Sequence, residues 1–143
     1  MFLKPFRIKS QTAIKGSDRK KLRTQVGQQF SVECYLMDLV PNKEDITVIK
    51  LNTHSGSDVV VYSIHGNPAF FELDMVLYPT VYTLWKFPGL LTVFTTWPPV
   101  FKKLTSGADL MLPGLIVKGE VRPNFMGGFQ KGTPCSVKLL GNK

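Results

Sequence analysis

Few residues of this 143-residue chain have types and spacing that could do chemistry, and most of those are cations. No nucleophile-elbow, P-loop or His-Glu-x-x-His pattern occurs in the sequence. The adjacent carboxylates Glu44 and Asp45 follow Lys43, which is typical of a solvated approach to a strand rather than of an acid/base pair. His54 and His65 both stand in turn-like sequence and are expected at the surface. We therefore expect no enzymatic activity.

The cysteine pattern does not indicate a metal or a cofactor. Cys34 and Cys135 are far apart, neither belongs to a Cys-x-x-Cys motif, and neither has a histidine nearby. Two reduced cysteines that pack as small hydrophobic side chains are the expected state. No apolar run of about 18 residues is present, so no membrane span is expected, and no secretory signal follows the basic N-terminus. Free thiols without a signal favour a cytoplasmic location.

The positive charge of the chain is concentrated at its start. Residues 1–30 carry a net charge of +7, whereas residues 31–143 carry only +1. A nearly neutral body with a basic head indicates a polyanionic partner, and each phosphate contact would add roughly 0.7–0.9 to the slope of log affinity against log salt. The alternative is a solvated face that aids solubility, but such a face usually mixes both signs. The candidate RNA-binding cations of this head are Lys9, Lys15, Arg19, Lys20, Lys21 and Arg23.

A second candidate RNA-binding segment lies near residue 107. A short helix is expected over residues 98–104, followed by a turn of small residues, a strand-like apolar run and a stop at Pro-Gly. Small residues leave bare backbone that a phosphate or a sugar edge could approach closely. The alternative is an ordinary helix–turn–strand corner. The candidate residues of this segment are Lys102, Lys103, Ser106, Gly107, Ala108, Asp109, Pro113 and Gly114.

One long helix should position the basic head. It is expected to begin near residues 16–18, with Ser17 or Asp18 as the N-cap. An apolar stripe at i, i+4 and i+8, formed by Leu22, Val26 and Phe30, should dock on a sheet. The same geometry leaves the basic residues of the helix in water. Gly27 weakens the helix by about 1 kcal/mol relative to Ala, so its last turn is expected to fray.

The remaining elements predict a mixed fold. A short strand is expected over residues 5–9, a three-stranded antiparallel meander over 46–51, 59–64 and 69–73, and a second helix opened by Pro79 that ends before residue 87. Residues 90–97 read as a strand or connector, 118–128 as an exposed loop and 135–140 as a strand. The residues at 141–142 resemble the first half of a hairpin turn, so the chain looks cut there.

Aromatic residues are dense between residues 78 and 97, and two interpretations remain open. Tyr78, Tyr82 and Trp85 fall at helical spacing, and such stripes in small domains usually fill the core. They could instead serve as stacking platforms for bases. A protein-interaction domain that docks another polypeptide on this segment is the main alternative to RNA binding. That alternative predicts salt-insensitive binding with a strongly negative heat-capacity change.

Three stretches, residues 6–23, 77–85 and 107–115, resemble the N-terminal region of the ligatin family of translation factors, and the last of them resembles the signature of PUA domains. A more distant likeness is to the family of the malignant T-cell amplified protein. The resemblance implies an α+β fold. A pre-PUA α/β domain, with an antiparallel meander and two helices, would occupy residues 1–94. A PUA-like β pseudo-barrel, incomplete at its C-terminal end, would occupy residues 95–143.

The same resemblance implies a function in translation initiation and in ribosome recycling. Family members bind RNA of the small ribosomal subunit and place or release tRNA at the P site without GTP, and they carry further C-terminal domains that would be partners of this region. The PUA turn is the usual RNA-facing element, a role we carry over to residues 106–114. The accessory PUA domain of an RNA-modifying enzyme is a further alternative, although it requires a catalytic domain for which this chain has no room.

Overall fold

The computed structural model describes residues 4–31, 36–117 and 130–141, and it divides the chain into two compact units, residues 1–90 and 91–143. The boundary suggested by the sequence, after residue 94, falls inside a strand of the second unit, β6 (Thr92–Thr96). Each unit is described by itself. Within the described ranges, no helix is both long and apolar enough to cross a membrane.

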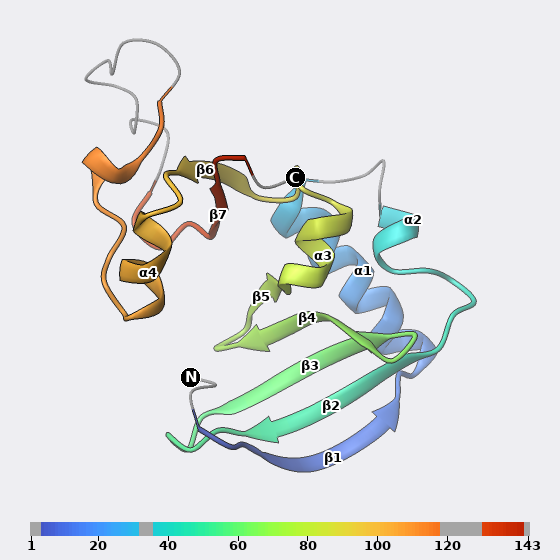
Figure 1. The fold of residues 1–143 in the computed structure, drawn as a ribbon. Coiled ribbons are helices and arrows are strands. Elements are labelled where there is room, and N and C mark those ends of the chain that lie inside the picture. Colours follow the sequence, from blue (N-terminus) through green and yellow to red (C-terminus); the bar gives the residue numbers. More distant parts are fainter. Residues whose placement is uncertain (1–3, 32–35, 118–129, 142–143) are drawn as a thin grey trace. The chain divides into compact units, whose positions relative to one another are not determined.

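Unit 1 contains an antiparallel sheet in which the strands are ordered as they occur in the chain (Figure 1). The expected three-stranded meander forms its centre, and one further strand extends the sheet on each side. The strand predicted over residues 5–9 is longer than expected and pairs with β2 across a bulge near Lys9. The strands are β1 (Arg7–Ala13), β2 (Ile46–Asn52), β3 (Asp58–Ile64), β4 (Asn67–Leu73) and β5 (Val76–Pro79).

The core of unit 1 lies between this sheet and α1 (Gly16–Phe30). The period-2 alternation of the strands places Ile46, Phe70 and Leu77 among the buried residues, and cross-strand pairing sets Phe70 opposite Tyr62. Leu22 and Val26 of α1 join the same cluster, which confirms the predicted apolar stripe. Figure 1 shows α1 and α3 on one face of the sheet.

The start of α1 differs from its prediction. The N-cap is Lys15, with extended backbone angles, and no side chain caps the first turn. The prediction of Ser17 or Asp18 as N-cap is therefore wrong, because both residues already lie inside the helix, which begins at Gly16. At the other end the helix continues past Gly27 to Phe30 and stops where Ser31 adopts left-handed angles. The side chain of Leu36 lies 3.5 Å from the position where a Cβ on Gly27 would stand, so it covers the helix at this glycine.

The second predicted helix is shorter than expected. Tyr78 and Pro79 belong to β5, and α3 (Val81–Lys86) starts only after Thr80. The Thr80 hydroxyl accepts the Thr83 amide and donates to the Pro68 carbonyl, so this residue both caps α3 and ties it to β4. Proline is compatible with the first turn of a helix, but Pro79 pairs with Phe70 of β4 and is therefore part of the strand β5.

Unit 2 contains a parallel pair of strands, β6 and β7 (Cys135–Leu139), together with α4 (Val100–Thr105) and a short 3-10 turn (Leu112–Gly114). The apolar run after Asp109 was predicted to be a strand, and this is wrong: only Leu115 forms a bridge, to Thr96. Pro113 within the run lacks an N–H for a ladder, which favours the 3-10 turn. The predicted loop at 118–128 and the second residue of the turn at 141–142 lie outside the described residues.

Candidate nucleic-acid interface

The exposed cations of α1 are its lysines. Lys15, Lys20 and Lys21 are exposed, whereas Leu22 and Val26 on the same helix are buried against the sheet. One carboxylate shares this surface, since Asp18 lies 3.8 Å from the Lys21 ammonium. The three lysines stand at the N-cap and in the first two turns of the helix, and we call their exposed side chains together the lysine surface.

The two arginines of α1 hold another part of unit 1. Arg23 donates from Nε and from its terminal nitrogen to the carbonyl of Val40, at 3.2 and 2.6 Å. Arg19 donates to the carbonyls of Pro41 and Asn42. These carbonyls come directly after α2 (Leu36–Leu39), so the arginines fasten the chain that leads from that short helix to β2. The expectation that both side chains lie in water is wrong.

The first turn of α1 is exposed, and it contains one carboxylate, that of Asp18. No side chain caps it, and Gly16 and Ser17 are exposed with Lys15 beside them. The N-terminus of a helix carries uncompensated N–H groups and a partial positive charge, which favour a phosphate. The lysine surface and this turn therefore combine two kinds of donor at one end of a 15-residue helix.

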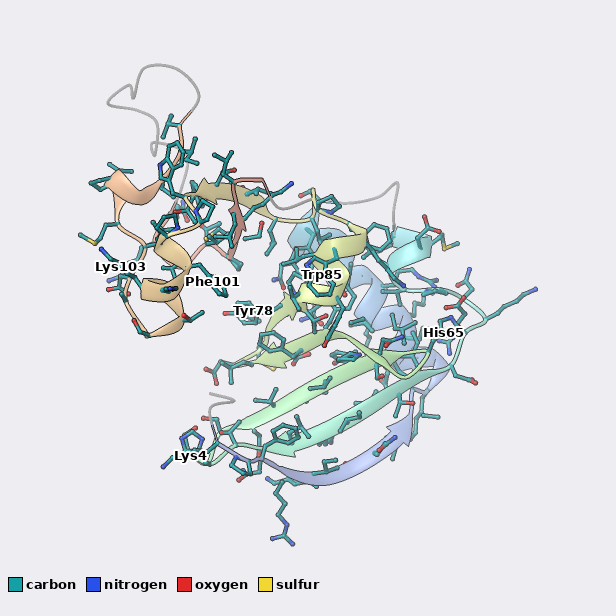
Figure 2. All side chains as sticks on the ribbon, in the orientation of Figure 1. Lys4, His65, Tyr78, Trp85, Phe101 and Lys103 are labelled. Atoms are coloured by element: carbon teal, nitrogen blue, oxygen red, sulfur yellow. The ribbon has the colours of Figure 1, made fainter. Side chains whose placement is uncertain are left out.

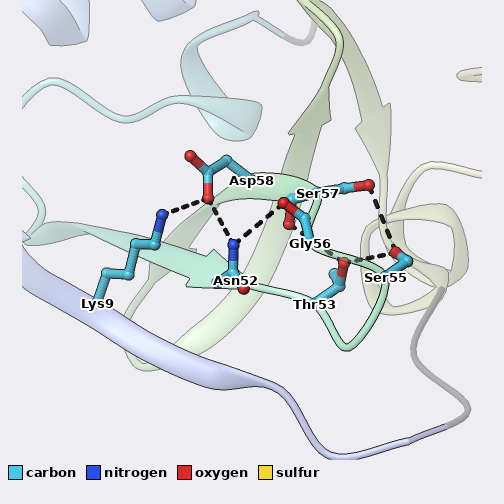
Figure 3. A network of polar contacts seen from close by, with 7 residues as sticks. All are labelled: Lys9, Asn52, Thr53, Ser55, Gly56, Ser57 and Asp58. Carbon is cyan, nitrogen blue, oxygen red and sulfur yellow. Dashed lines mark hydrogen bonds and ion pairs between the residues drawn. The ribbon is translucent and has the colours of Figure 1, made fainter.

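Lys9 lies on β1 and is already paired. Its ammonium is 2.6 Å from the carboxylate of Asp58, which also accepts the side-chain amide of Asn52 at 3.0 Å (Figure 3). These two hydrogen bonds, first that from Lys9, lower the pKa of Asp58 below its ordinary value of 3.8. Lys9 therefore links the edge strand to the β2–β3 turn, and it belongs to a different element from the lysine surface.

The candidate turn of unit 2 is a closed helix end. Gly107 has a φ of +93°, its N–H donates to Leu104 at 3.0 Å, and the Ala108 N–H donates to Lys103 at 3.0 Å. This pair of bonds defines a Schellman motif with glycine at the left-handed position. The Ser106 amide bonds to the carbonyls of Lys102 and Lys103. The N–H groups of residues 106–108 are thus used within the turn.

The turn consequently offers acceptors rather than donors. Ser106, Gly107 and Ala108 are exposed, and no heavy atom lies within 4 Å of the position where a Cβ on Gly107 would stand. Asp109 adds an exposed carboxylate. A C-terminal helix end also carries partial negative charge. A phosphate does not suit this corner, whereas a sugar hydroxyl or a base N–H, each of which can donate, does.

Two lysines precede this acceptor corner in the chain, and the 3-10 turn at Leu112–Gly114 follows it. Lys102 and Lys103 of α4 are exposed; Figure 2 labels Lys103. Pro113 is exposed as well, but Gly114 has a structural role: a Cβ there would stand 3.3 Å from the side chain of Leu110. The Gly114 carbonyl also accepts the hydroxyl of Thr96 at 2.6 Å.

The other candidate residues show no catalytic or metal-binding arrangement in the described parts of the chain. No group of three or more His, Cys, Asp or Glu side chains is placed to hold a metal there. His54 and His65 are both exposed, as predicted, and the His65 ring contacts the Glu44 carboxylate. Cys135 is a free thiol but an exposed one, so its prediction as a packed side chain is wrong; Cys34 lies outside the described residues.

The sequence did not reveal the structural role of one residue. Thr96 is fully buried and joins β6 to the 3-10 turn, but nothing in the sequence distinguishes it from its neighbour Thr95. Of the two interpretations left open for the aromatic segment, core packing is wrong for Tyr82 and Trp85, because both side chains are exposed. Because α3 has only six residues, it buries little more than Thr83 and leaves its aromatic rings outside.

An α/β unit with a five-stranded sheet is thus followed by a smaller unit whose described strands form a parallel pair. The family model described as "Pre-PUA-like domain" matches residues 2–88, and the model described as "elF2D, PUA domain" matches residues 91–143. The chain therefore belongs to the pre-PUA family, with an eIF2D-type PUA domain after it.

Curated relatives agree with this assignment. Eukaryotic translation initiation factor 2D is 53% identical in Bos taurus and 52% identical in Homo sapiens, in each case over 100% of this chain and 24% of the relative. The chain thus spans about a quarter of the length of these relatives. Translation machinery-associated protein 20 of Saccharomyces cerevisiae is 28% identical, over 88% of this chain and 67% of its own length.

Solved structures share the fold at low sequence identity. A conserved PUA domain protein from Thermoplasma acidophilum has a TM-score of 0.61 at 20% identity, covering 92% of this chain and 73% of its own. The hypothetical protein PH0734.1 from Pyrococcus horikoshii has a TM-score of 0.55 at 17% identity, covering 74% and 64%. The predicted α+β class, with a pre-PUA and a PUA domain, is confirmed.

Proposed function

We propose that this chain is a non-enzymatic, RNA-binding module of a cytoplasmic translation initiation and recycling factor. The names of its relatives, translation initiation factor 2D and translation machinery-associated protein 20, support a role in translation. In this proposal the module binds RNA of the small ribosomal subunit and helps to place or release tRNA at the P site without GTP. Further domains of a full-length factor would act with it, as the quarter-length match to its relatives suggests.

One observation carries the proposal: in the unit that matches the PUA model, an exposed glycine corner rich in acceptors lies directly after two exposed lysines. Lys102 and Lys103 can contact phosphates, while the carbonyls of the corner and Asp109 accept from ribose hydroxyls. DNA lacks the 2′-hydroxyl, so this pairing of groups favours RNA. We therefore retain the candidate RNA-binding residues of unit 2. Of the two ligands considered for residues 106–108, a phosphate and a sugar edge, we propose the sugar edge.

The lysine surface of α1 is proposed as a second phosphate-binding site. Lys15, Lys20 and Lys21 would contact backbone phosphates together with the uncapped first turn. Arg19 and Arg23 keep only the donors that are not used on the carbonyls of residues 40–42. Lys9 would contribute to the general positive potential, because its ammonium is held by Asp58.

The first test reverses the charge of the lysine surface. A triple variant, Lys15→Glu, Lys20→Glu and Lys21→Glu, is expected to weaken binding to purified small subunits in a sedimentation assay. It should also reduce the slope of log affinity against log salt by about 2–3, the value for three lost phosphate contacts. The matched control reverses Lys43, Lys50 and Lys131, which are exposed elsewhere and change the net charge equally. Equal losses in both variants would leave only a general charge effect and overturn this site.

The second test fills the corner of unit 2. Ala108→Trp places a bulky side chain on an exposed position, and we expect it to reduce protection of tRNA and affinity for an oligoribonucleotide. Affinity for the oligodeoxyribonucleotide of the same sequence should change much less, because that strand cannot use the hydroxyl acceptors. Thr133→Trp, on another exposed turn of unit 2, is the control. Wild-type binding of RNA by Ala108→Trp would remove the corner from the interface.

A further inference from the structure

A groove of about 630 Å³ lies within unit 1, between α2, the β3–β4 turn and α3. Its floor contains side chains that pack on the hydrophobic core: Ile64, Ala69 and Phe87. A hollow of this volume is within the range that accommodates small ligands, or one or two bulky side chains of a partner. It involves none of the lysines of α1, so it is separate from the RNA surface proposed for this unit.

Large apolar side chains are exposed along the groove. Trp85 is 72% exposed, Met37 is 57% exposed and Tyr82 is 52% exposed. Figure 2 shows Trp85 on α3 and His65 at the β3–β4 turn. The rings of Tyr82 and Trp85 make an edge-to-face pair with centroids 5.5 Å apart, and the Asn42 amide contacts the Met37 sulfur at 3.6 Å. Trp, Tyr and Met are the residue types enriched in protein interfaces, where Trp and Tyr often dominate the binding energy.

The charged side chains of the groove differ in kind from those that dominate the chain. Two carboxylates, Asp38 and Glu44, line it, against one lysine, Lys86, whereas the whole chain has a net charge of +8. Glu44 is in contact with His65, but Asp38 has no ion-pair partner among the described residues. The unpaired carboxylate of Asp38 repels phosphate groups and attracts a cation, so a basic peptide suits this rim better than an RNA strand does.

We propose that this groove docks a polypeptide segment of a partner protein in which a bulky apolar or aromatic side chain lies within a few residues of an Arg or Lys. The apolar side chain would insert between Met37 and Trp85, over the floor. The basic side chain would pair with Asp38 at the rim. This site is independent of the RNA function, because it uses different residues and the opposite charge.

Peptide selection tests this chemistry without a known partner. Random 12-residue peptides displayed on phage would be selected on the immobilised 143-residue chain, synthesised with a fluorophore and measured by anisotropy. We expect the selected peptides to share an apolar or aromatic anchor near a basic residue. Trp85→Ala should weaken them about tenfold or more, as for an interface hot spot, and Met37→Ala should weaken them to a lesser degree. Asp38→Lys should weaken them severalfold through like-charge repulsion.

Matched controls separate the groove from general effects. Met75→Ala removes a more exposed methionine at the β4–β5 turn, and Asp74→Lys reverses an exposed carboxylate at the same turn. Both should change affinity less than twofold. Binding of small subunits should be unaffected by Trp85→Ala, which distinguishes failure of this proposal from failure of the RNA proposal.

Three outcomes would overturn the docking proposal. The first is that selection yields no peptide whose binding depends on Trp85. The second is that the peptides lack basic residues and tolerate Asp38→Lys. The third is that a 12-residue oligouridine, rather than any peptide, shifts the indole N–H resonance of Trp85 in a heteronuclear NMR titration. The last result would assign the exposed rings to base stacking instead.

Discussion

The two units of this chain are stabilised in different ways. Among the described residues of unit 1, ten apolar side chains are buried, from Leu22 to Leu90, and most of them join one cluster between α1 and the sheet. In unit 2, among the described residues, the buried side chain is a polar one, that of Thr96. Several large apolar side chains of unit 2, such as Trp97 and Phe101, are about half exposed. Unit 1 therefore depends on apolar burial, whereas the described part of unit 2 depends on hydrogen bonds.

Thr96 concentrates those hydrogen bonds. Its hydroxyl donates to the Gly114 carbonyl at 2.6 Å, and its own carbonyl accepts the Leu140 amide at 2.9 Å. The neighbouring Thr95 carbonyl accepts the Ile116 amide at 2.8 Å. Two adjacent positions thus connect β6 to the 3-10 turn, to the segment after it and to the end of β7. The comparison implies that surface substitutions in unit 1 report on binding alone, while those in unit 2 require a check of folding.

The two tryptophans of the chain allow the units to be followed separately. Trp85 lies in unit 1 and Trp97 in unit 2. A chain with Trp97→Phe reports the unfolding of unit 1 by fluorescence, and a chain with Trp85→Phe reports that of unit 2. Each stability prediction below is measured by urea unfolding of these two reporter chains.

The largest expected effect comes from the core of unit 1. Phe70 is fully buried, pairs with Tyr62 across the sheet and stacks on Phe30 with ring centroids 6.2 Å apart. Phe70→Ala should lower the free energy of unfolding of unit 1 by about 3–5 kcal/mol, because it removes apolar burial and leaves a cavity. The Trp85 signal should report this loss.

The matched control for this core substitution lies in unit 2. Phe101 is 51% exposed on α4, so Phe101→Ala should change the Trp97 transition by less than about 1 kcal/mol. Equal losses from Phe70→Ala and Phe101→Ala would contradict the contrast, since they would show that unit 2 also depends on aromatic packing.

The next effect separates the arginines of α1 from its lysines. Arg23→Ala removes two charge-assisted bonds to the Val40 carbonyl, and we expect a loss of about 1.5–3 kcal/mol in unit 1. Val40 is buried, so no water replaces the guanidinium easily. The control, Lys20→Ala, should change stability by at most about 0.5 kcal/mol because this side chain is exposed. If Lys20→Ala costs as much as Arg23→Ala, the division of α1 into structural and RNA-facing cations is wrong.

The sequence predicted well those parts of the fold that short-range patterns determine. The alternation of residues 59–64 and the i, i+4 stripe of Leu22 and Val26 were sufficient for the central strands and for α1. The sequence was less informative where two local preferences compete. Pro79 suits a helix start and an edge strand equally well, and only its pairing opposite Phe70 decided between them. Leu110 and Met111 suit a strand, but Pro113 removes a ladder donor and the segment turns instead.

The candidate site was predictable in composition but not in contacts. Charge counting found the cations of α1, yet it cannot tell an arginine that binds a carbonyl in the 40–42 segment from a lysine in water. Small residues located the turn at Gly107, but only the hydrogen bonds show that the amides of residues 106–108 are already used within the turn. Long-range contacts of this kind leave no periodicity in the sequence.

A smaller effect tests the hydrogen bonds of unit 2. Thr96→Val keeps the shape of the side chain but removes the hydroxyl that donates to the Gly114 carbonyl. We expect a loss of about 1–2 kcal/mol in the Trp97 transition, the usual range for a buried acceptor that loses its partner. Thr95→Val is the control, because the Thr95 hydroxyl makes no hydrogen bond to any other described residue. A Thr96→Val chain as stable as the control would show that backbone pairing alone holds β6.

The smallest effect concerns acid stability and should appear in unit 1 only. The hydrogen bond from Lys9, together with that from Asn52, lowers the pKa of Asp58 below 3.8 in the folded state. A lowered folded-state pKa stabilises the fold above the unfolded-state pKa, and this stabilisation is lost as the pH falls through the folded-state value. Asp58→Asn should therefore reduce the stability difference of unit 1 between neutral pH and about pH 3, with a small effect because the carboxylate is exposed.

Lys9→Gln should reproduce that change, since it removes the main partner of the same carboxylate. Asp74→Asn, at the exposed β4–β5 turn, should leave the acid limb as it is. The Trp97 transition should be the same in all three variants, because Asp58 lies in unit 1. If the loss of stability at acid pH changes equally in both reporter chains, the two units do not unfold independently. The chain would then unfold as a single cooperative body, and the contrast between an apolar core and a hydrogen-bonded unit would not hold.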